Sequence, residues 1–321
     1  MPASDSPQEP DDAASRPPSA AQLRRFAAKH GFECHQVGPL PATGMVNWIY
    51  ALGETAILRV SNASHPDGVR DALTESVAVP AARAAGIHTP ELLVLDDSRE
   101  VIDGLCTIYE RVPGQDLASR IAAGRPIPDR VYHDVGREVA KLHRDVIDVP
   151  DPDDRLDTHP RWTGPDAIAD LLANPPIDVH VARTVTSLAE RMEPILQQAS
   201  RFRRFLHQDL SFGNIMISQD EFAAIIDWGD AGWADPAQEF AYLPLSVVDP
   251  MLRGYREIMP LDGDDTAELR ILWDHLGRAV YRLRSTEEPH NPGRRSAGAE
   301  LIDLIGLLLS GADRRWLGSS M

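Results

Sequence analysis

The 321-residue sequence contains few cysteines and no long hydrophobic run. Its two cysteines, Cys34 and Cys106, are too few for a disulfide framework or a thiolate metal site. Residues 301–309 form the longest apolar stretch, but Asp303 interrupts it and it is too short to cross a bilayer. The N-terminal segment MPASDSPQEPDDAASRPPSA lacks the basic and apolar regions of a signal peptide. We therefore expect a cytoplasmic protein in a reducing compartment.

Positive charge is also scarce, because 32 basic side chains face 49 acidic ones and the formal net charge is −17. A nucleic acid or an anionic membrane would require a basic face. We therefore expect neither of these partners, and the acidity permits a cationic small molecule as ligand. Lysine is nearly absent, since Lys29 and Lys141 are the only two in the chain.

The order of the sequence patterns predicts two unlike halves. Residues 1–18 are rich in Pro, Ser and Asp and predict a disordered tail. Residues 19–112 combine a helix at 20–30 and another at 69–85 with short, Gly- and Pro-separated strand patterns near 34–37, 45–52, 55–60, 91–95 and 105–112. Residues 113–321 are mainly helical, at 116–123, at 129–146, at 179–200 and after the hairpin to about 315, with that small hairpin at 214–226 and an irregular insertion at 148–176.

Three polar side chains stand at a fixed spacing in the second half. The segment FLHQDLSFGNIMIS places His207, Asp209 and Asn214 in the pattern H-x-D-x-x-x-x-N, and Asp227 directly follows the apolar run AAII. Phosphoryl transfer needs a carboxylate beside the attacking hydroxyl and oxygen ligands for the Mg²⁺ that bridges the phosphates. This spacing is typical of a kinase catalytic loop. It predicts Asp209 as the catalytic residue, with Asn214 and Asp227 as Mg²⁺ ligands. The competing interpretation is two turn residues and a capping Asn.

The stretch HQDLSFGNIMI…AAIIDWGDAGWADPAQEFAYL closely resembles the aminoglycoside phosphotransferase and choline kinase-like family of small-molecule kinases. That family has an H-G-D-x-H-x-x-N loop, then I-D-W/F and a G-D-P segment. Here Gln208 replaces the common Gly, Ser211 the second His, and Ala234 the Gly of G-D-P. The resemblance is strong over residues 205–245 and follows the element order over most of residues 35–290. It implies a protein-kinase-like two-lobed α+β fold, with a small antiparallel-sheet N-lobe and a larger, mainly helical C-lobe.

The resemblance assigns nucleotide binding to the strand-rich half. The loop at 41–50 would fold over the phosphates, with Gly44 allowing close approach of the backbone and Asn47 bonding a phosphate oxygen. Taken alone, this loop also fits a plain hairpin turn. Residues 108–112 look like the hinge between the lobes, where main-chain groups from Glu110 to Val112 would bind the purine edge. Such contacts do not distinguish ATP from GTP.

Kinases of this fold normally carry a lysine on the third strand, paired with a helix glutamate. Lys29 precedes the first strand and Lys141 lies in the helical half, so neither fits this position. Arg59 stands there instead, and an arginine can hold phosphate with two prongs and keep its charge when partly buried. Glu75, on the following helix, would be its partner. The alternatives are an exposed strand arginine and a solvated glutamate.

Several other residues of the second half are expected to support the site rather than react. The resemblance implies that His207 and Asp235 brace the catalytic loop from its two sides. His143 fits a packed or capping histidine better than a catalyst, and Trp228 fits the core.

The acceptor is the part of the site that the sequence determines least. Drug-modifying relatives line the acceptor cleft with acids, and the candidates here are Asp230, Glu239, Asp274, Glu287 and Glu288. Arg278, Arg282 and Arg284 lie in the same region and favour the opposite, an acceptor with a carboxylate.

We expect a phosphotransferase that moves the γ-phosphoryl of ATP or GTP, with Mg²⁺, to a hydroxyl of an aminoglycoside or related cationic antibiotic. Two alternatives stay open. One is a metabolic kinase of the choline, homoserine or sugar type, and the other is a nucleotide-binding protein with little turnover.

Overall fold

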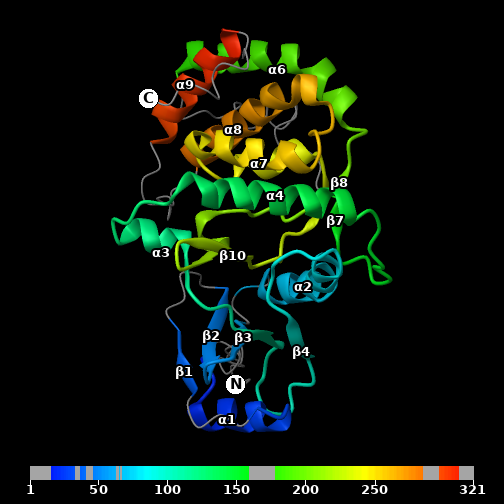
Figure 1. The fold of residues 1–321 in the computed structure, drawn as a ribbon, viewed down its shortest axis with the longest axis vertical. Coiled ribbons are helices and arrows are strands. Elements are labelled where there is room, and N and C mark those ends of the chain that lie inside the picture. Colours follow the sequence, from blue (N-terminus) through cyan, green and yellow to red (C-terminus); the bar gives the residue numbers. More distant parts are fainter. Residues whose placement is uncertain are drawn as a thin grey trace, which may run out of the picture.

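The structure is a computed structural model that describes residues 16–32, 37–40, 46–62, 65, 67–158, 178–284 and 296–310. Its N-terminal part is built on a five-stranded antiparallel sheet, shown at the bottom of Figure 1. The strand order is β1-β2-β3-β5-β4, with β1 at Val37–Pro39, β2 at Asn47–Leu52, β3 at Ala56–Ser61, β4 at Leu92–Asp96 and β5 at Cys106–Glu110. Helix α1 (Ala20–Lys29) covers its lower end and α2 (Asp67–Ala84) lies at its upper end.

The alternation of side chains along β3 separates a core face from a polar face. Leu58 and Val60 are fully buried in a cluster with Leu23 and Phe26 of α1. Arg59 points to the other face, and so does Asn47, because Asn47 pairs with Ser61 and Ile49 with Arg59 across the two strands. The pleat therefore directs two of the predicted nucleotide-binding residues to one side of the sheet.

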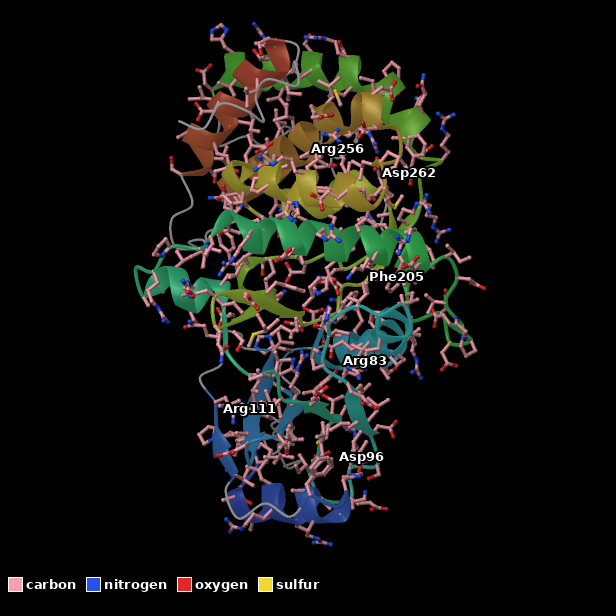
Figure 2. The ribbon with its side chains drawn as sticks, viewed as in Figure 1. Arg83, Asp96, Arg111, Phe205, Arg256 and Asp262 are labelled. Atoms are coloured by element: carbon pink, nitrogen blue, oxygen red, sulfur yellow. The ribbon has the colours of Figure 1, made fainter. Side chains whose placement is uncertain are left out.

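Polar contacts attach α1 to the sheet at the end far from the helical part. Ser19 caps the helix, and its side chain and that of Gln22 form a capping box. Asp96, labelled near the bottom of Figure 2, accepts hydrogen bonds from Lys29 Nζ at 2.9 Å and from His30 Nε2 at 2.7 Å. These groups stabilise the sheet rather than line the candidate site.

The C-terminal part stacks helices above two small sheets, as Figure 1 shows. Its helices within the described residues are α3 (Leu117–Ala122), α4 (Asp129–Asp145), α6 (Val179–Ala199), α7 (Val248–Ile258), α8 (Ala267–Arg284) and α9 (Ala297–Leu309). One sheet has the order β10-β9-β6, with β6 at Gln115–Asp116, β9 at Ile215–Ser218 and β10 at Glu221–Ile225. The other has the order β7-β11-β8, with β7 at Asp157–Thr158, β8 at Arg204–Leu206 and β11 at Gly232–Ala234. The 3₁₀ turns are η1 (Phe212–Asn214), η2 (Pro236–Ala241), η3 (Leu245–Val247) and η4 (Asp264–Thr266).

Helices α4 and α7 approach each other closely because each has a glycine at the crossing. A Cβ on Gly136 would lie 1.8 Å from the Met251 carbonyl oxygen, and one on Gly254 would lie 1.9 Å from that of His133. Both obstacles are backbone atoms, which cannot rotate away. Because α4 also packs against β8, the strand that leads into the predicted catalytic loop, this crossing supports the site from behind.

We expect Gly136→Ala to lower the free energy of unfolding by about 2–3 kcal/mol, because the added methyl must push two helices apart. Gly306→Ala is the matched control, since Gly306 also lies inside a helix but has nothing within 4 Å of its would-be Cβ. There the exchange should be neutral or stabilise by up to about 1 kcal/mol. Urea unfolding of both variants measures the difference, and equal effects would contradict the packing argument.

The predicted organisation agrees with the structure in order and type for the long elements, including α6, which continues through Pro194. The short strands β6, β7, β8 and β11 were not predicted, because two- and three-residue strands carry no periodic signal. Asn214, expected to begin a strand, ends the 3₁₀ turn η1 and β9 follows it. The expected tail lies outside the described residues except for its last three positions. In the described residues, no helix combines the length and apolar content needed to cross a bilayer.

Candidate active site

The predicted catalytic loop is a tight turn between β8 and β9 that brings Asp209 and Asn214 into contact. Asn214 Nδ2 donates to both the carbonyl oxygen and Oδ2 of Asp209, each at 2.8 Å. The amide of Ser211 donates to the same carbonyl at 2.7 Å, which closes the turn. The H-x-D-x-x-x-x-N spacing thus holds a carboxylate and an amide side by side.

His207 links this loop to the strand that precedes Asp227. Its Nε2 donates to the Ile226 carbonyl at 2.9 Å, and its Nδ1 accepts from the Asp209 amide at 3.2 Å. Burial lowers the pKa of His207, which keeps the ring neutral with one nitrogen as donor and the other as acceptor. Trp228 is buried against this ring, as expected of a core residue. His207 therefore braces the loop, as the sequence analysis expects.

The support on the other side of the loop comes from Glu239, which the sequence analysis did not single out for it. The amides of His207 and Gln208 donate to its two carboxylate oxygens at 2.8 and 3.2 Å. Asp235, expected in this role, caps η2 through the Ala237 amide and forms a buried ion pair with Arg270. Glu239 lies 32 positions from His207, so only tertiary structure brings them together.

Gln208 has a backbone φ of +69°, in the left-handed region where glycine is favoured. The family's usual glycine at this position has a physical reason here, since the peptide must turn to present the next residue, Asp209. Strain of this kind is typical of functional turns.

Asp227 has the same left-handed backbone, with φ of +67°, and its side chain is about half exposed. Arg59 Nη2 donates to Asp227 Oδ1 at 3.1 Å, across the join of the two parts of the molecule. Desolvation raises the pKa of Asp227, but the Arg59 guanidinium outweighs it and the pKa lies below its usual value. Asp227 is thus ionised at neutral pH, as a metal ligand must be.

Arg59 and Glu75 form the ion pair expected of them, with Nη1 and Oε1 2.7 Å apart. Glu75 is buried and accepts two further hydrogen bonds, one from the Trp228 amide at 3.1 Å and a short one from the Tyr109 hydroxyl. Tyr109 was not predicted, because nothing in the sequence near β5 shows that its hydroxyl reaches α2. The Glu75 carboxylate on α2 therefore joins two other segments, β3 through Arg59 and the segment after Asp227 through the Trp228 amide.

The pKa of Asp209 is unusual for an aspartate. Burial, reinforced by the charges of Asp227 and Asp230, raises it to about 7, while Arg278 and the Asn214 hydrogen bond oppose the rise. Only the ionised carboxylate can accept a proton from a hydroxyl. Such a group matches a general base that works near neutral pH.

We therefore expect kcat/KM to fall about tenfold per pH unit below pH 7 and to be level above it. Mg²⁺ bound at Asp227 would cancel one of the charges that raise the Asp209 pKa, so the profile of kcat should break at a lower pH than that of kcat/KM. Initial rates with saturating and limiting substrate measure both profiles. A level kcat/KM down to about pH 5.5 would contradict the assignment of Asp209 as base.

The residues present fit a magnesium ion shared with a nucleotide. Asn214 Oδ1 accepts no hydrogen bond from the described residues, and Asp227 offers an ionised, half-exposed carboxylate. No group of three or more His, Cys, Asp and Glu in the described residues could hold a metal alone. Mg²⁺ characteristically takes one or two protein oxygens and completes its shell with phosphates and water.

The hinge candidates differ in which main-chain groups are available. The Glu110 amide donates to the Glu91 carbonyl and the Arg111 amide to that of Thr55, at 2.9 and 2.8 Å. No described residue accepts from the Val112 amide. Within the described residues, the Val112 N–H is thus available to a purine, whereas Glu110 could offer only its carbonyl.

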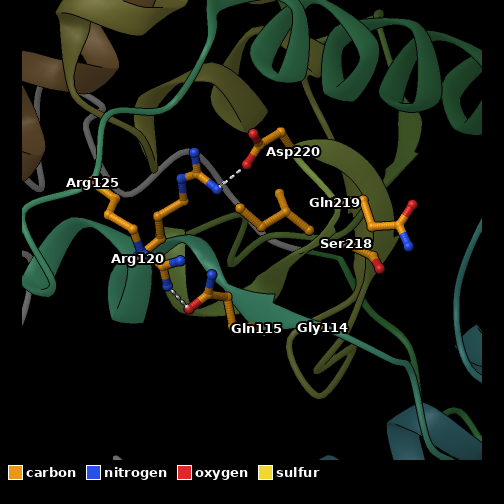
Figure 3. A pocket seen from close by; sticks show the side chains of 8 residues that line it. Gly114, Gln115, Arg120, Arg125, Ser218, Gln219 and Asp220 are labelled. Atoms are coloured by element: carbon orange, nitrogen blue, oxygen red, sulfur yellow. Dashed lines mark hydrogen bonds and ion pairs between the residues drawn. The ribbon is translucent and has the colours of Figure 1, made fainter.

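A pocket of about 350 Å³ lies beside this hinge, against β6, β9 and the turn before β10 (Figure 3). Its two arginines are engaged, Arg120 with Asp220 and Arg125 with Gln115 at 2.7 Å. Gly114 is required at its edge, since a Cβ there would lie 2.0 Å from the Ile217 carbonyl oxygen. The pocket does not include the predicted catalytic residues.

Two predicted nucleotide-binding residues, Gly44 and Asn47, belong to the expected loop and to the strand before β3. Gly44 lies outside the described residues. Asn47 begins β2 on the same face as Arg59, and a Cβ on Gly68 at the start of α2 would lie 3.2 Å from its Oδ1. Asn47 is thus near the first turn of α2, and its contact with phosphate stays a prediction.

The two-lobed arrangement and the loop that pairs Asp209 with Asn214 define the kinase-like class of phosphotransferases. The sequence model of the phosphotransferase enzyme family matches residues 42–272, and the chain belongs to this family. The predicted family, the fold class and, at the level of the family, the O-phosphotransferase activity are confirmed. No curated protein sequence matches the chain significantly.

Three solved structures with similar folds are distant in sequence, at 15–18% identity. Aminoglycoside 2′-phosphotransferase-IIIa in complex with GDP has a TM-score of 0.62 at 15% identity, covering 91% of this chain and 98% of its own. A choline/ethanolamine kinase family protein from Mesorhizobium loti has a TM-score of 0.61 at 16% identity, covering 93% and 96%. Macrolide 2′-phosphotransferase MphH from Brachybacterium faecium has a TM-score of 0.57 at 18% identity, covering 87% and 97%. These similarities establish the fold and leave the acceptor undetermined.

Proposed function

We propose that this protein transfers the γ-phosphoryl group of ATP or GTP, bound with Mg²⁺, to a hydroxyl of a small molecule. The observation that carries the proposal is the contact of Arg59 with both Glu75 and Asp227, at 2.7 and 3.1 Å. It brings the cation expected at the phosphates to the carboxylate expected at the metal, beside the loop that holds Asp209.

Each residue has a role that its geometry supports. Asp209 orients the acceptor hydroxyl and accepts its proton as the new bond to phosphorus forms. Asn214 and Asp227 hold Mg²⁺, which would neutralise charge on the phosphates. Arg59, held by Glu75, neutralises further phosphate charge. Positioning and electrostatics then supply most of the rate.

Two classes of acceptor follow from the sequence and its family. The first is an aminoglycoside or related cationic antibiotic, supported by net acidity and by solved relatives described as complexes with kanamycin and gentamicin. The second is a metabolite, for which the choline/ethanolamine kinase family protein is a precedent. Similar phosphotransferases have been solved with GDP and with ATP, which supports GTP or ATP as the phosphoryl donor.

The test is mass spectrometry of products after incubation with Mg²⁺, ATP or GTP, and a pooled panel of antibiotics, choline, homoserine and sugars. A compound that gains one phosphoryl group in the presence of wild type, and not with Asp209→Asn, supports the proposal. Nucleotide binding without transfer to any compound would favour the low-turnover alternative.

A further inference from the structure

The acceptor side of the site contains one arginine, Arg278, that forms no ion pair within the described residues, although its charge lowers the pKa of Asp209. Of the three arginines predicted near it, Arg282 forms an ion pair with Glu300 of α9, and the side chain of Arg284 lies outside the described residues. Arg278 is half-buried, forms no ion pair with any described residue, and its Nε has no hydrogen-bond partner there. An arginine in this state is typical of a site that binds an oxyanion.

A chain of contacts places Arg278 beside the predicted catalytic residue. Its guanidinium lies over the ring of Tyr242, 3.9 Å from the centroid, and the Tyr242 hydroxyl donates to Gln208 Oε1 at 3.1 Å. Gln208 directly precedes Asp209. Because one face of the guanidinium covers the ring, its N–H groups point along the plane and can form two parallel bonds with a carboxylate or phosphate.

Gln208 adds a second polar group without a partner. The residue is only 5% exposed, and its Nε2 forms no hydrogen bond with the described residues, although burying such a donor costs free energy. Glycine would adopt the backbone of Gln208 with less strain, so the glutamine side chain is not there for the turn. A ligand that accepts a hydrogen bond from Nε2 would offset the cost of burying this amide. Both unsatisfied groups, Gln208 Nε2 and Arg278 Nε, are hydrogen-bond donors that would suit an anion.

The acids predicted to line the acceptor cleft do not form a binding surface for a cationic acceptor within the described residues. Glu239 is buried and occupied by the catalytic-loop amides, and Asp274 is only 1% exposed. Asp230 is half-exposed, but Arg70 lies 3.5 Å from it. Glu287 and Glu288 lie outside the described residues. On the acceptor side of the site, the described residues therefore present hydrogen-bond donors that suit an anion more than carboxylates that suit a cation.

We propose that Arg278 and the Gln208 amide bind a carboxylate or phosphate group of the acceptor, so that the acceptor is an alcohol that carries an anionic group. This inference rests on the proposed function. The acceptor hydroxyl oxygen bonds to the γ-phosphorus, the bond from that phosphorus to the β-γ bridging oxygen breaks, and the hydroxyl proton passes to Asp209. The products are a phosphate monoester and a nucleoside diphosphate.

The test compares matched acceptors with Mg²⁺ and ATP or GTP. Serine, homoserine, glycerate and glycerol 3-phosphate are paired with serinamide, homoserine amide, glyceramide and glycerol, and kanamycin and choline are included as cations. We expect the anionic member of at least one pair to be phosphorylated with kcat/KM about 10- to 100-fold above its neutral counterpart. Transfer to neutral or cationic compounds without this preference would overturn the inference and leave the proposed function intact. Transfer to none of them, with nucleotide bound, would overturn both.

Substitutions then test whether Arg278 and Gln208 cause the preference for an anionic acceptor. Arg278→Gln should raise KM for the anionic acceptor about 10- to 100-fold and leave KM for the neutral counterpart unchanged. Because the Arg278 charge also lowers the pKa of Asp209, the two acceptors are compared well above pH 7, where Asp209 is ionised in both proteins. Gln208→Gly, which relieves the left-handed backbone and so should not impair folding, should raise the same KM about tenfold. Arg253→Gln, on the exposed face of α7, is the control and should change neither value. An unchanged KM in Arg278→Gln would contradict the inference.

Discussion

Replacing Asp209 with asparagine is expected to lower kcat by about 10²- to 10⁴-fold, the range that a positioned general base contributes. The asparagine can keep the 2.8 Å contact with Asn214 Nδ2 through its own oxygen, so the loop should hold its shape. What is lost is the ability to accept the hydroxyl proton. Steady-state rates with an identified acceptor measure the effect.

The nucleotide affinity of Asp209→Asn serves as its control. Asp209 is not assigned to the nucleotide, so Mg–nucleotide binding measured by calorimetry should stay within a few-fold of wild type. Turnover within about tenfold of wild type would contradict the assignment of Asp209 as base.

The raised pKa of Asp209 predicts the direction in which Asp209→Asn changes the stability of the fold. A folded-state pKa of about 7, above the usual value of 3.8, means that the protonated carboxyl favours folding and that this contribution is lost as pH rises through 7. Asparagine carries no charge at any pH. Asp209→Asn should therefore be at least as stable as wild type at pH 8, and a loss of kcat cannot then be attributed to unfolding.

Replacing Asp227 with asparagine is expected to act on a different step, the binding of Mg–nucleotide. Asparagine tolerates the left-handed backbone at this position, so the substitution changes mainly the charge. We expect the affinity for Mg–nucleotide to fall about 10- to 100-fold or more, because a metal ligand and a partner of Arg59 lose their charge together.

The comparison of affinities with Mg²⁺ and with a chelator isolates the metal. Wild type should bind nucleotide more tightly with Mg²⁺, and Asp227→Asn should lose most of this gain. Asp230→Asn is the matched control, since it removes a nearby negative charge that is not assigned to the metal, and it should keep the gain. An undiminished Mg²⁺ effect in Asp227→Asn would show that the ion is held elsewhere.

Two chemically similar carboxylates thus acquire different properties from their surroundings. Asp209 is largely enclosed, and neighbouring negative charges raise its pKa, whereas Asp227 is half-exposed and Arg59 lowers its pKa. Environments that separate the pKa values of paired acids are typical of sites where one acts as base and the other stays ionised. Burial accounts for most of the rise at Asp209, and the contact of Arg59 with Asp227 for most of the lowering at Asp227.

The N-terminal half shows why an arginine can stand where kinases usually have lysine. Glu75 has three donors around its carboxylate, from Arg59, Tyr109 and the Trp228 amide. This carboxylate fixes one edge of the Arg59 guanidinium and leaves the other to reach Asp227. A lysine, with its single ammonium, could not present two edges in this way.

The sequence alone determined the features that depend on near neighbours. The five-residue spacing from Asp209 to Asn214 specifies a turn in which the two side chains meet, and the alternation in β3 places Arg59 opposite its core neighbours. The long helices follow from apolar periodicity in the same way. The family resemblance then identified Glu75, whose 2.7 Å contact with Arg59 the structure contains.

Only the tertiary structure decided the contacts between distant segments. Glu239 beneath the catalytic loop, Tyr109 on Glu75 and Arg278 over Tyr242 each join residues more than 30 positions apart. The sequence contained three arginines and five acids that pointed to opposite acceptors, and packing showed which were already paired. Whether a charge is neutralised inside the protein or left for a ligand depends on which side chains the fold brings within a few ångströms, and spacing along the chain does not contain that information.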